Sequence, residues 1–91
     1  MLTMRMIGQN DYSIHEDGQP IGRIRFASER VPGIWLWHIQ MHAPGLSPFG
    51  SARSLIEAKA EFKTAWLAYK EKHGPEKLAK AYAGMNLRDE S

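Results

Sequence analysis

Several polar residues in three stretches of the chain have the side chains that nucleic-acid-binding proteins use. Arginine binds phosphate oxygens, while hydroxyl, amide and imidazole groups can contact base edges in the grooves. The residues are Ser13, His15, Arg23, Arg25, His38, Gln40 and His42. If alternating positions of a β-sheet bring them together, they form a flat basic surface that could bind nucleic acid or another partner.

Two pairs of residues have the spacing of other chemistry. His38 and His42 are four apart, which would suit a metal pair on a helix, but an extended strand separates them by about 13 Å. Glu57 and Glu61 are also four apart, on a predicted helix flank that we expect to face solvent. The chain has no cysteine, which excludes disulfides, thiolate ligands and a cysteine nucleophile. We therefore predict no metal site.

Sequence motifs of catalysis and cofactor binding are not found. The chain has no nucleophile elbow and no glycine pattern of the dinucleotide-binding or P-loop type. We therefore predict no catalytic residue, no cofactor and no enzymatic activity.

The composition indicates one small globular domain. The chain has 91 residues, of which 43% are hydrophobic and 24% charged, with a net charge of +2. This charge permits nucleic-acid binding without the strong excess of a dedicated binder. The apolar start, Met1 to Ile7, is too short for a signal peptide, and no stretch approaches a membrane span. We expect a cytoplasmic protein with no membrane partner.

Alternating apolar residues predict an antiparallel sheet over about residues 10–42. A hairpin with a three-residue loop at 16–18 would pair His15 with Gln19 and leave Gly18 left-handed. A third strand follows, and the segment 43–50 predicts a loop that could hold a short edge strand near Phe49. The inward face would carry Tyr12, Ile14, Gly22, Ile24, Phe26, Trp35, Trp37, Ile39 and Met41. Alternation then sends the polar residues above to the outer face.

The second half of the chain predicts helices. Ser54 and Glu57 form a capping box, so a main helix should begin at 54 and run to about 72. Gly74 and Pro75 should end it, and a short helix over about 75–83 should follow, with a polar tail over 86–91.

Two apolar stripes lie on the main helix. The stronger one would complete the core with Leu55, Ala58, Phe62, Ala65, Trp66 and Tyr69. The weaker one contains Ile56, Ala60 and Leu67. Either the short C-terminal helix covers the weaker stripe, or the stripe is a surface for self-association or for a partner.

The combination of these motifs resembles a family of small uncharacterised alphaproteobacterial proteins. The resemblance covers about residues 12–70 and implies a sheet-plus-helix domain, with no activity or cofactor. It rests on Tyr12, Asp17-Gly18, Ile21-Gly22-Arg23-Ile24, Trp35-Leu36-Trp37, Glu57-Ala58-Lys59, Phe62 and Trp66. The predicted order of elements is also similar to the three-stranded DNA-binding domains of plant ethylene-response regulators and some integrases, although their dense Arg and Trp pattern is not found here.

Together these patterns predict an α+β domain in which a three-stranded antiparallel meander packs on one long helix beside a short C-terminal helix. We expect a small non-enzymatic binding or accessory module that acts through protein contacts or self-association. The alternative is a nucleic-acid-binding domain that uses the outer face of the sheet.

Overall fold

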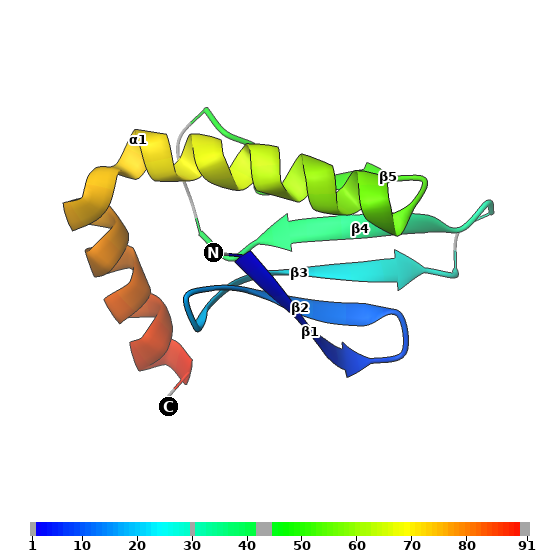
Figure 1. Ribbon diagram of the computed structural model, residues 1–91, viewed down its shortest axis with the longest axis horizontal. Coiled ribbons are helices and arrows are strands. Elements are labelled where there is room, and N and C mark those ends of the chain that lie inside the picture. The colour runs from blue at the N-terminus through cyan, green and yellow to red at the C-terminus, as the bar shows by residue number, and fades with distance from the viewer. Residues whose placement is uncertain (1, 30, 42–44, 90–91) are drawn as a thin grey trace.

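The fold is α+β, with one sheet and one long helical element. The computed structural model describes residues 2–29, 31–41 and 45–89. The strands β1 (Leu2–Gly8), β2 (Asp11–Glu16), β3 (Gln19–Ala27), β4 (Ile34–Ile39) and β5 (Phe49–Ala52) form a five-stranded antiparallel sheet in chain order. The helix α1 (Leu55–Asp89) follows and crosses one face of the sheet (Figure 1).

The prediction of three strands is wrong, because one further strand is added at each edge of the meander. β1 pairs with β2, and β5 pairs with β4. An edge strand leaves unpaired N–H and C=O groups, which a neighbouring segment can satisfy. β5 contains Gly50, which lies opposite Trp37, and a Cβ atom at Gly50 would run into the Trp37 ring. Gly50 weakens the strand pattern in the sequence, but its lack of a side chain is what lets β5 lie beside Trp37 of β4.

The β2–β3 hairpin has a shorter loop than predicted. Glu16 pairs with Gln19, so the loop is the two-residue turn Asp17-Gly18, whose φ angles are 49° and 87°. Both positive values suit a type I′ turn. The register shifts by one residue between Ile14 and His15. This bulge pairs Ile14 with Gly22 rather than with Ile21. The loop prediction is wrong, but the bulge keeps the predicted inner face.

The hydrophobic core lies between the sheet and the first part of α1. Ile14, Ile24, Trp37, Ile39, Met41, Ala58, Phe62, Trp66 and Tyr69 are buried as predicted, whereas Tyr12, Phe26, Trp35, Leu55 and Ala65 are half-buried. Ile21, Ala27 and Ala52 are buried as well, although the sequence pattern does not single them out. Ile21 is the extra residue of the bulge, which explains why simple alternation misses it.

The start of α1 follows the predicted capping pattern. Ser54 Oγ accepts a hydrogen bond of 3.1 Å from the Glu57 amide, as a capping box requires. The Glu57 carboxylate accepts a bond of 3.4 Å from the amide of Arg53, one residue before the expected Ser54. These contacts satisfy backbone donors that the first helical turn leaves free.

The predicted left-handed break at Gly74 is present within α1, but the prediction of a short C-terminal helix that ends near residue 83 is wrong. α1 is one helical element of 35 residues that continues to Asp89, through most of the expected polar tail. Its backbone bends at Gly74, where φ is 72° and ψ is 167°, and Pro75 follows without an N–H to donate. We call residues 55–73 the first limb and residues 75–89 the second limb.

The two limbs of α1 have different positions relative to the sheet. The first limb crosses the sheet, while the second turns away at the bend and passes the end that carries the β2–β3 turn (Figure 1). There the side chains of Gln19 and Asn86 exchange hydrogen bonds of 3.1 and 3.2 Å. Leu78, Ala81 and Tyr82 of the second limb pack against the core. The second limb therefore does not cover the weaker stripe, in which Ile56 is 80% and Leu67 52% exposed.

Candidate functional site

The outer face of the sheet brings several of the predicted polar residues together. Arg5 pairs with Ser13, Ser13 with Arg23, Arg23 with His38, and His38 with Phe49, so these five residues form one row across the five strands. Arg25 lies in the next row, between Asp11 and Leu36. Pairs directly opposite in an antiparallel sheet share a face. The structure therefore provides a flat polar surface at this position.

The structure does not bring the other three predicted residues, His15, Gln40 and His42, into these two rows. His15 is half-buried beside the bulge, and its Nε2 atom is buried with no hydrogen-bond partner among the described residues. Gln40 is exposed just beyond the end of β4, where its backbone N–H donates a hydrogen bond of 2.8 Å to the Ile21 carbonyl. His42 lies outside the described residues.

Two carboxylates pair with Arg23 and Arg25, whereas Arg5 is exposed and forms no ion pair among the described residues. Arg23 forms an ion pair with Asp11, in which Arg23 Nε donates to Oδ1 at 2.8 Å and Nη2 contacts Oδ2. The hydrogen bond from Arg23 lowers the pKa of Asp11, and in return raises the pKa of Arg23. Arg25 contacts Glu29 at 3.4 Å in an exposed i, i+4 pair. This pairing leaves the face less basic than its arginines suggest.

An exposed aromatic ring lies on the same outer face. Phe49 is 66% exposed and pairs with His38 across β4 and β5. The sequence allows a short edge strand near Phe49, and β5 is that strand, but its pairing with β4, which puts Phe49 on the outer face, is not predicted from the sequence. Phe49 gives the outer face a ring on which a base could stack.

The inner face of the sheet is only partly covered by α1. In the described part of the chain, the α1 backbone packs against β3, β4 and β5 but not against β1 or β2. A groove of about 560 Å³ therefore runs between β1 and the first limb. It is lined by Leu2, Thr3, Met4, Ile14, Glu16, Ile24, Lys59, Ala60, Phe62, Lys63, Trp66 and Leu67.

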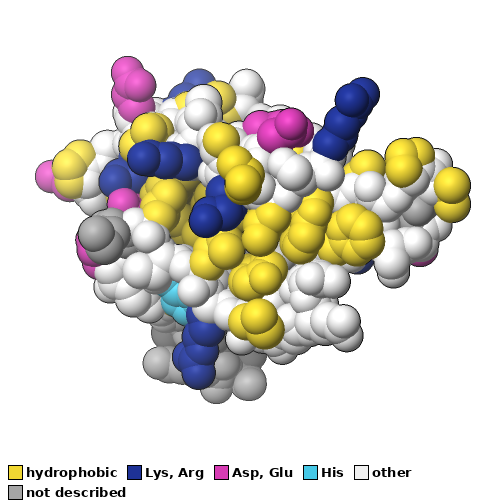
Figure 2. Space-filling view, turned by 45° about the vertical axis from the view of Figure 1, so that its right-hand side comes forward, with side chains coloured by type: hydrophobic (Ala, Val, Ile, Leu, Met, Phe, Trp, Pro, Cys, Tyr) yellow, Lys and Arg dark blue, Asp and Glu magenta, His cyan; other side chains and the backbone are white. Residues whose placement is uncertain are grey.

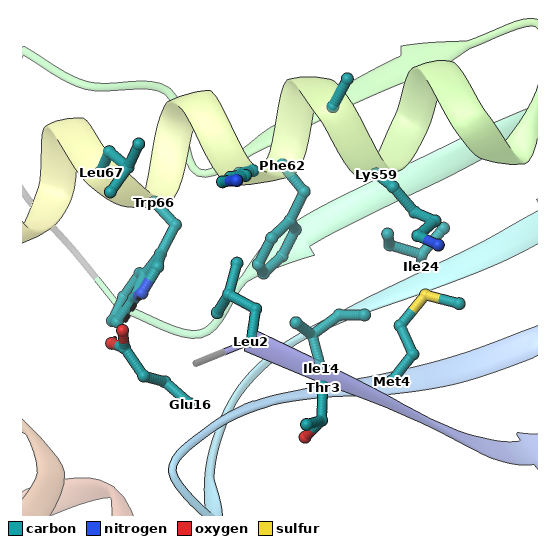
Figure 3. A pocket seen from close by; sticks show the side chains of 12 residues that line it. Leu2, Thr3, Met4, Ile14, Glu16, Ile24, Lys59, Phe62, Trp66 and Leu67 are labelled. Atoms are coloured by element: carbon teal, nitrogen blue, oxygen red, sulfur yellow. Dashed lines mark hydrogen bonds between the residues drawn. The ribbon is translucent and has the colours of Figure 1, made fainter.

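The walls of the groove are mostly apolar. Phe62 and Trp66 extend from α1 toward Leu2 of β1 (Figure 3), and both of these rings are buried, whereas Leu67 is half-exposed on the helix. Hydrophobic side chains gather across the middle of one face of the molecule, and Lys and Arg side chains stand over them (Figure 2). Ala60 and Leu67 of the predicted association stripe belong to this wall, whereas Ile56 is exposed beyond it.

Of the charged groups that line the groove, Glu16 has hydrogen-bond partners, whereas Lys59 and Lys63 have no carboxylate partner among the described residues. Glu16 closes one end, where its carboxylate accepts bonds of 2.8 Å from Trp66 Nε1 and 2.7 Å from Lys70 Nζ. Lys59 and Lys63 project at the helix side, and neither forms an ion pair with a carboxylate of the described residues. The groove thus combines apolar walls with two uncompensated positive charges at its rim.

The predicted solvent-facing glutamates of α1 have structural roles. Glu57 helps to cap the helix, as described above, and Glu61 accepts a hydrogen bond of 3.0 Å from Trp37 Nε1. Both glutamates lie away from the groove lining. Both side chains are exposed, as expected from the sequence.

Comparison of this chain with protein-family models, with curated proteins and with solved structures finds no match. The resemblance to a small alphaproteobacterial family stays a prediction. Within residues 2–29, 31–41 and 45–89, no helix is long and apolar enough to cross a membrane, and no three His, Asp or Glu side chains cluster as metal ligands would.

Proposed function

We propose that this protein is a small, non-enzymatic binding module that acts through protein contacts in the groove between β1 and α1. The observation that carries the proposal is the half-covered inner face of the sheet. A sheet with one apolar face needs a second layer to bury it. The α1 backbone passes over β3, β4 and β5, and Ile14 of β2 is buried in the same core, but Leu2 and Met4 of β1 are only half-buried. A partner would complete the layer over β1.

The exposed apolar side chains around the groove support this proposal. Leu67 is 52% and Met6 is 64% exposed, and Leu2 and Met4 are only half-buried. Burying a large apolar side chain contributes about 1.5–3 kcal/mol, so several such contacts suffice for a specific complex. Contiguous exposed apolar surface marks interaction sites in soluble proteins. The proposal places the module in the cytoplasm, which cell fractionation can test.

The experiment compares what the full chain captures from cells that produce it when the groove or the outer face is altered. Leu67→Glu places a charge in the groove, and Phe49→Glu places one on the outer face at a similarly exposed position. Quantitative mass spectrometry should find proteins that bind the wild type and the Phe49→Glu variant but not the Leu67→Glu variant. Proteins retained equally by all three chains would contradict a groove-binding module.

The outer face supports a second candidate function, which is nucleic-acid binding. The observation that favours it is Phe49, exposed in the same row as Arg23 and His38. Aromatic stacking contributes about 1–3 kcal/mol for each base, and arginine adds phosphate contacts. The ion pairs of Arg23 and Arg25 with Asp11 and Glu29 oppose this function, which is why it stands second.

Amide chemical shifts test the second candidate. Labelled protein is titrated with a single-stranded oligonucleotide and with mixed-sequence duplex DNA, at low and at physiological salt. Nucleic-acid binding should shift Ser13, Arg23, His38 and Phe49 and should weaken with salt. The Arg23→Ala, Arg25→Ala double variant should lose the shifts, and an unchanged spectrum at low salt would eliminate this class.

A further inference from the structure

We propose that β1 is a self-association site, at which the free edge of the strand pairs antiparallel with β1 of a second copy of this chain. This inference goes beyond the proposed function, because it concerns the backbone edge of the sheet rather than the groove above it. Three features of β1 carry it: an open edge, a regular segment centred on Met4, and a side-chain pattern that is symmetric about that residue.

β1 is the edge strand of the sheet that is open to a further strand. In the described part of the chain it pairs with β2 on one side and with no strand on the other. Its seven residues include no proline and one charged residue, Arg5, so it has few of the features that protect an edge. The opposite edge is β5, which has only four residues and against which the α1 backbone packs. Shortness and a neighbouring helix protect β5, whereas β1 has neither.

The regular part of β1 is a five-residue segment with Met4 at its centre. Residues 2–6 pair with residues 16–12 in unbroken register, and an irregularity between Met6 and Gly8 then ends this register. A bulge bends a strand, so a second copy would pair with the regular segment only. Two identical strands that pair antiparallel are related by a two-fold axis. The axis that uses all five residues passes through Met4.

The side chains of this segment match each other when the axis passes through Met4. Met4 then lies opposite Met4 of the second copy, Leu2 lies opposite Met6, and Thr3 lies opposite Arg5. Leu2 and Met4 point toward α1 and Thr3 points away from it, so the apolar pairs share the inner face (Figure 3). Met6 is 64% exposed, and Leu2 and Met4 are half-buried, so the pairing removes apolar surface from water.

The charge of Arg5 disfavours the neighbouring register. An axis through Arg5 would place the Arg5 side chains of the two copies directly opposite each other, and like charges at opposed positions destabilise a strand pair. In the register centred on Met4, Arg5 lies opposite the Thr3 hydroxyl instead, and both side chains are exposed. The charge of Arg5 and the extent of the regular segment therefore select the same register.

Pairing in this register joins the two sheets into one sheet of ten strands, five from each copy. The two-fold axis is perpendicular to the sheet, so both α1 helices lie on the same side and the two grooves open toward each other. Five paired residues from each copy form a small interface, so we expect the dimer to depend on the protein concentration.

The first experiment measures the oligomeric state of the full chain by sedimentation velocity over a range of protein concentrations. The wild type should form a dimer as the concentration rises. Thr3→Arg places an arginine opposite Arg5 of the second copy and should weaken the dimer about fivefold or more, whereas Thr3→Glu should strengthen it. Ser51→Arg makes the same charge change at an exposed hydroxyl residue of the other edge strand, and should leave the dimer unchanged. Opposite effects of two changes at one exposed residue separate pairing from misfolding.

The second experiment tests the register by cysteine cross-linking, which is selective because the chain has no cysteine of its own. Met4→Cys should form a covalent dimer under mild oxidation, since opposed residues of an antiparallel pair lie within the Cα–Cα range of a disulfide, about 4.4–6.8 Å. Met6→Cys is the matched control, because its two cysteines would lie four residues apart along the strands, or about 13 Å.

Four outcomes would overturn the proposal. The first is a wild type that stays monomeric at every concentration. The second is a dimer that Ser51→Arg weakens as much as Thr3→Arg does. The third is cross-linking of Met6→Cys as rapid as that of Met4→Cys. The fourth is a dimer that Leu67→Glu dissolves and Thr3→Arg leaves intact, which would place self-association in the groove instead.

Discussion

Trp66 Nε1 donates a hydrogen bond of 2.8 Å to Glu16 Oε2, and this bond joins the middle of α1 to the end of β2. The second oxygen of the same carboxylate accepts 2.7 Å from Lys70 Nζ. Tyr82, on the second limb, also lies close enough to Glu16 for the carboxylate to raise its pKa. One carboxylate therefore ties the end of β2 to the first limb of α1 and forms the end of the groove.

Replacing Glu16 by alanine should lower the free energy of unfolding by about 1–3 kcal/mol, because Trp66 Nε1 loses its acceptor in a part-buried position. Chemical denaturation, followed by tryptophan fluorescence, measures this loss. Glu71→Ala is the control, since Glu71 is an exposed carboxylate on the same helix and should change stability by less than about 0.5 kcal/mol. Equal effects of the two variants would show that the Glu16 contacts contribute nothing specific.

Stability should fall at alkaline pH through Tyr82. Burial, together with the neighbouring Glu16 carboxylate, raises the pKa of Tyr82 to about 12. A tyrosine in the unfolded chain loses its proton near pH 10, so the folded state binds more protons between about pH 10 and 12. The stabilisation is thus complete below pH 10 and is lost as the pH rises toward 12.

Denaturation of the wild type and of Tyr82→Phe at pH 8 and pH 11 measures this effect. The wild type should lose more free energy of unfolding between the two pH values than the variant does. Burial also raises the pKa of Tyr69, so the variant should keep part of the alkaline loss. Identical losses in the two proteins would mean that Tyr82 ionises as it does in the unfolded chain.

Gly22 should not tolerate a side chain. A Cβ atom there would overlap the carbonyl oxygen of His38 and the ring of Phe62. Gly22→Ala should therefore cost about 1–3 kcal/mol through overpacking of the core. Gly84→Ala is the matched control in the second limb, where a Cβ atom meets nothing within 4 Å. That change should stabilise the helix by about 0.5–1 kcal/mol, and thermal unfolding of both variants separates the two effects.

The ion pair between Asp11 and Arg23 should be visible in an acid titration. The hydrogen bond from Arg23 lowers the pKa of Asp11, so the pair stabilises the fold above the ordinary aspartate pKa of about 3.9. This contribution is lost as the pH falls through the lowered value, and for a surface pair it amounts to about 0.2–1 kcal/mol.

Carbon-detected NMR of the Asp11 carboxyl measures its pKa directly. Arg23→Ala should raise this pKa toward its ordinary value, whereas Lys80→Ala, on the distant second limb, should leave it unchanged. An Asp11 pKa that does not respond to Arg23→Ala would contradict the assigned cause of the shift.

Local patterns were enough to predict the inner face of the sheet and the helix that covers it. The alternation of Trp35, Trp37 and Ile39 identifies the buried side of β4, and Ser54 with Glu57 identifies the start of α1. These predictions succeed because they depend on side-chain periodicity and on hydrogen bonds between near neighbours.

Predictions that depend on the neighbours of a segment were less successful. β1 has an alternating pattern of its own, but only the free edge of β2 makes it a strand of this sheet. The bulge at Ile21 corrects the register after a shorter turn than expected, which the hairpin sequence does not reveal. The bend at Gly74 is signalled by Gly-Pro, yet the direction of the second limb depends on the contacts of Tyr82 and Asn86 with the β2–β3 hairpin.

The sequence by itself determined which side chains face the core and where the main helix begins, because both follow from spacings within a few residues. Only the tertiary structure decided the candidate sites. Asp11 and Arg23 neutralise each other across two strands, and Phe49 joins the outer face through a strand pairing. The groove exists because one helix covers only part of a five-stranded sheet. The number of strands that pair, and the width left uncovered, depend on contacts between segments far apart in the chain, which no local pattern specifies.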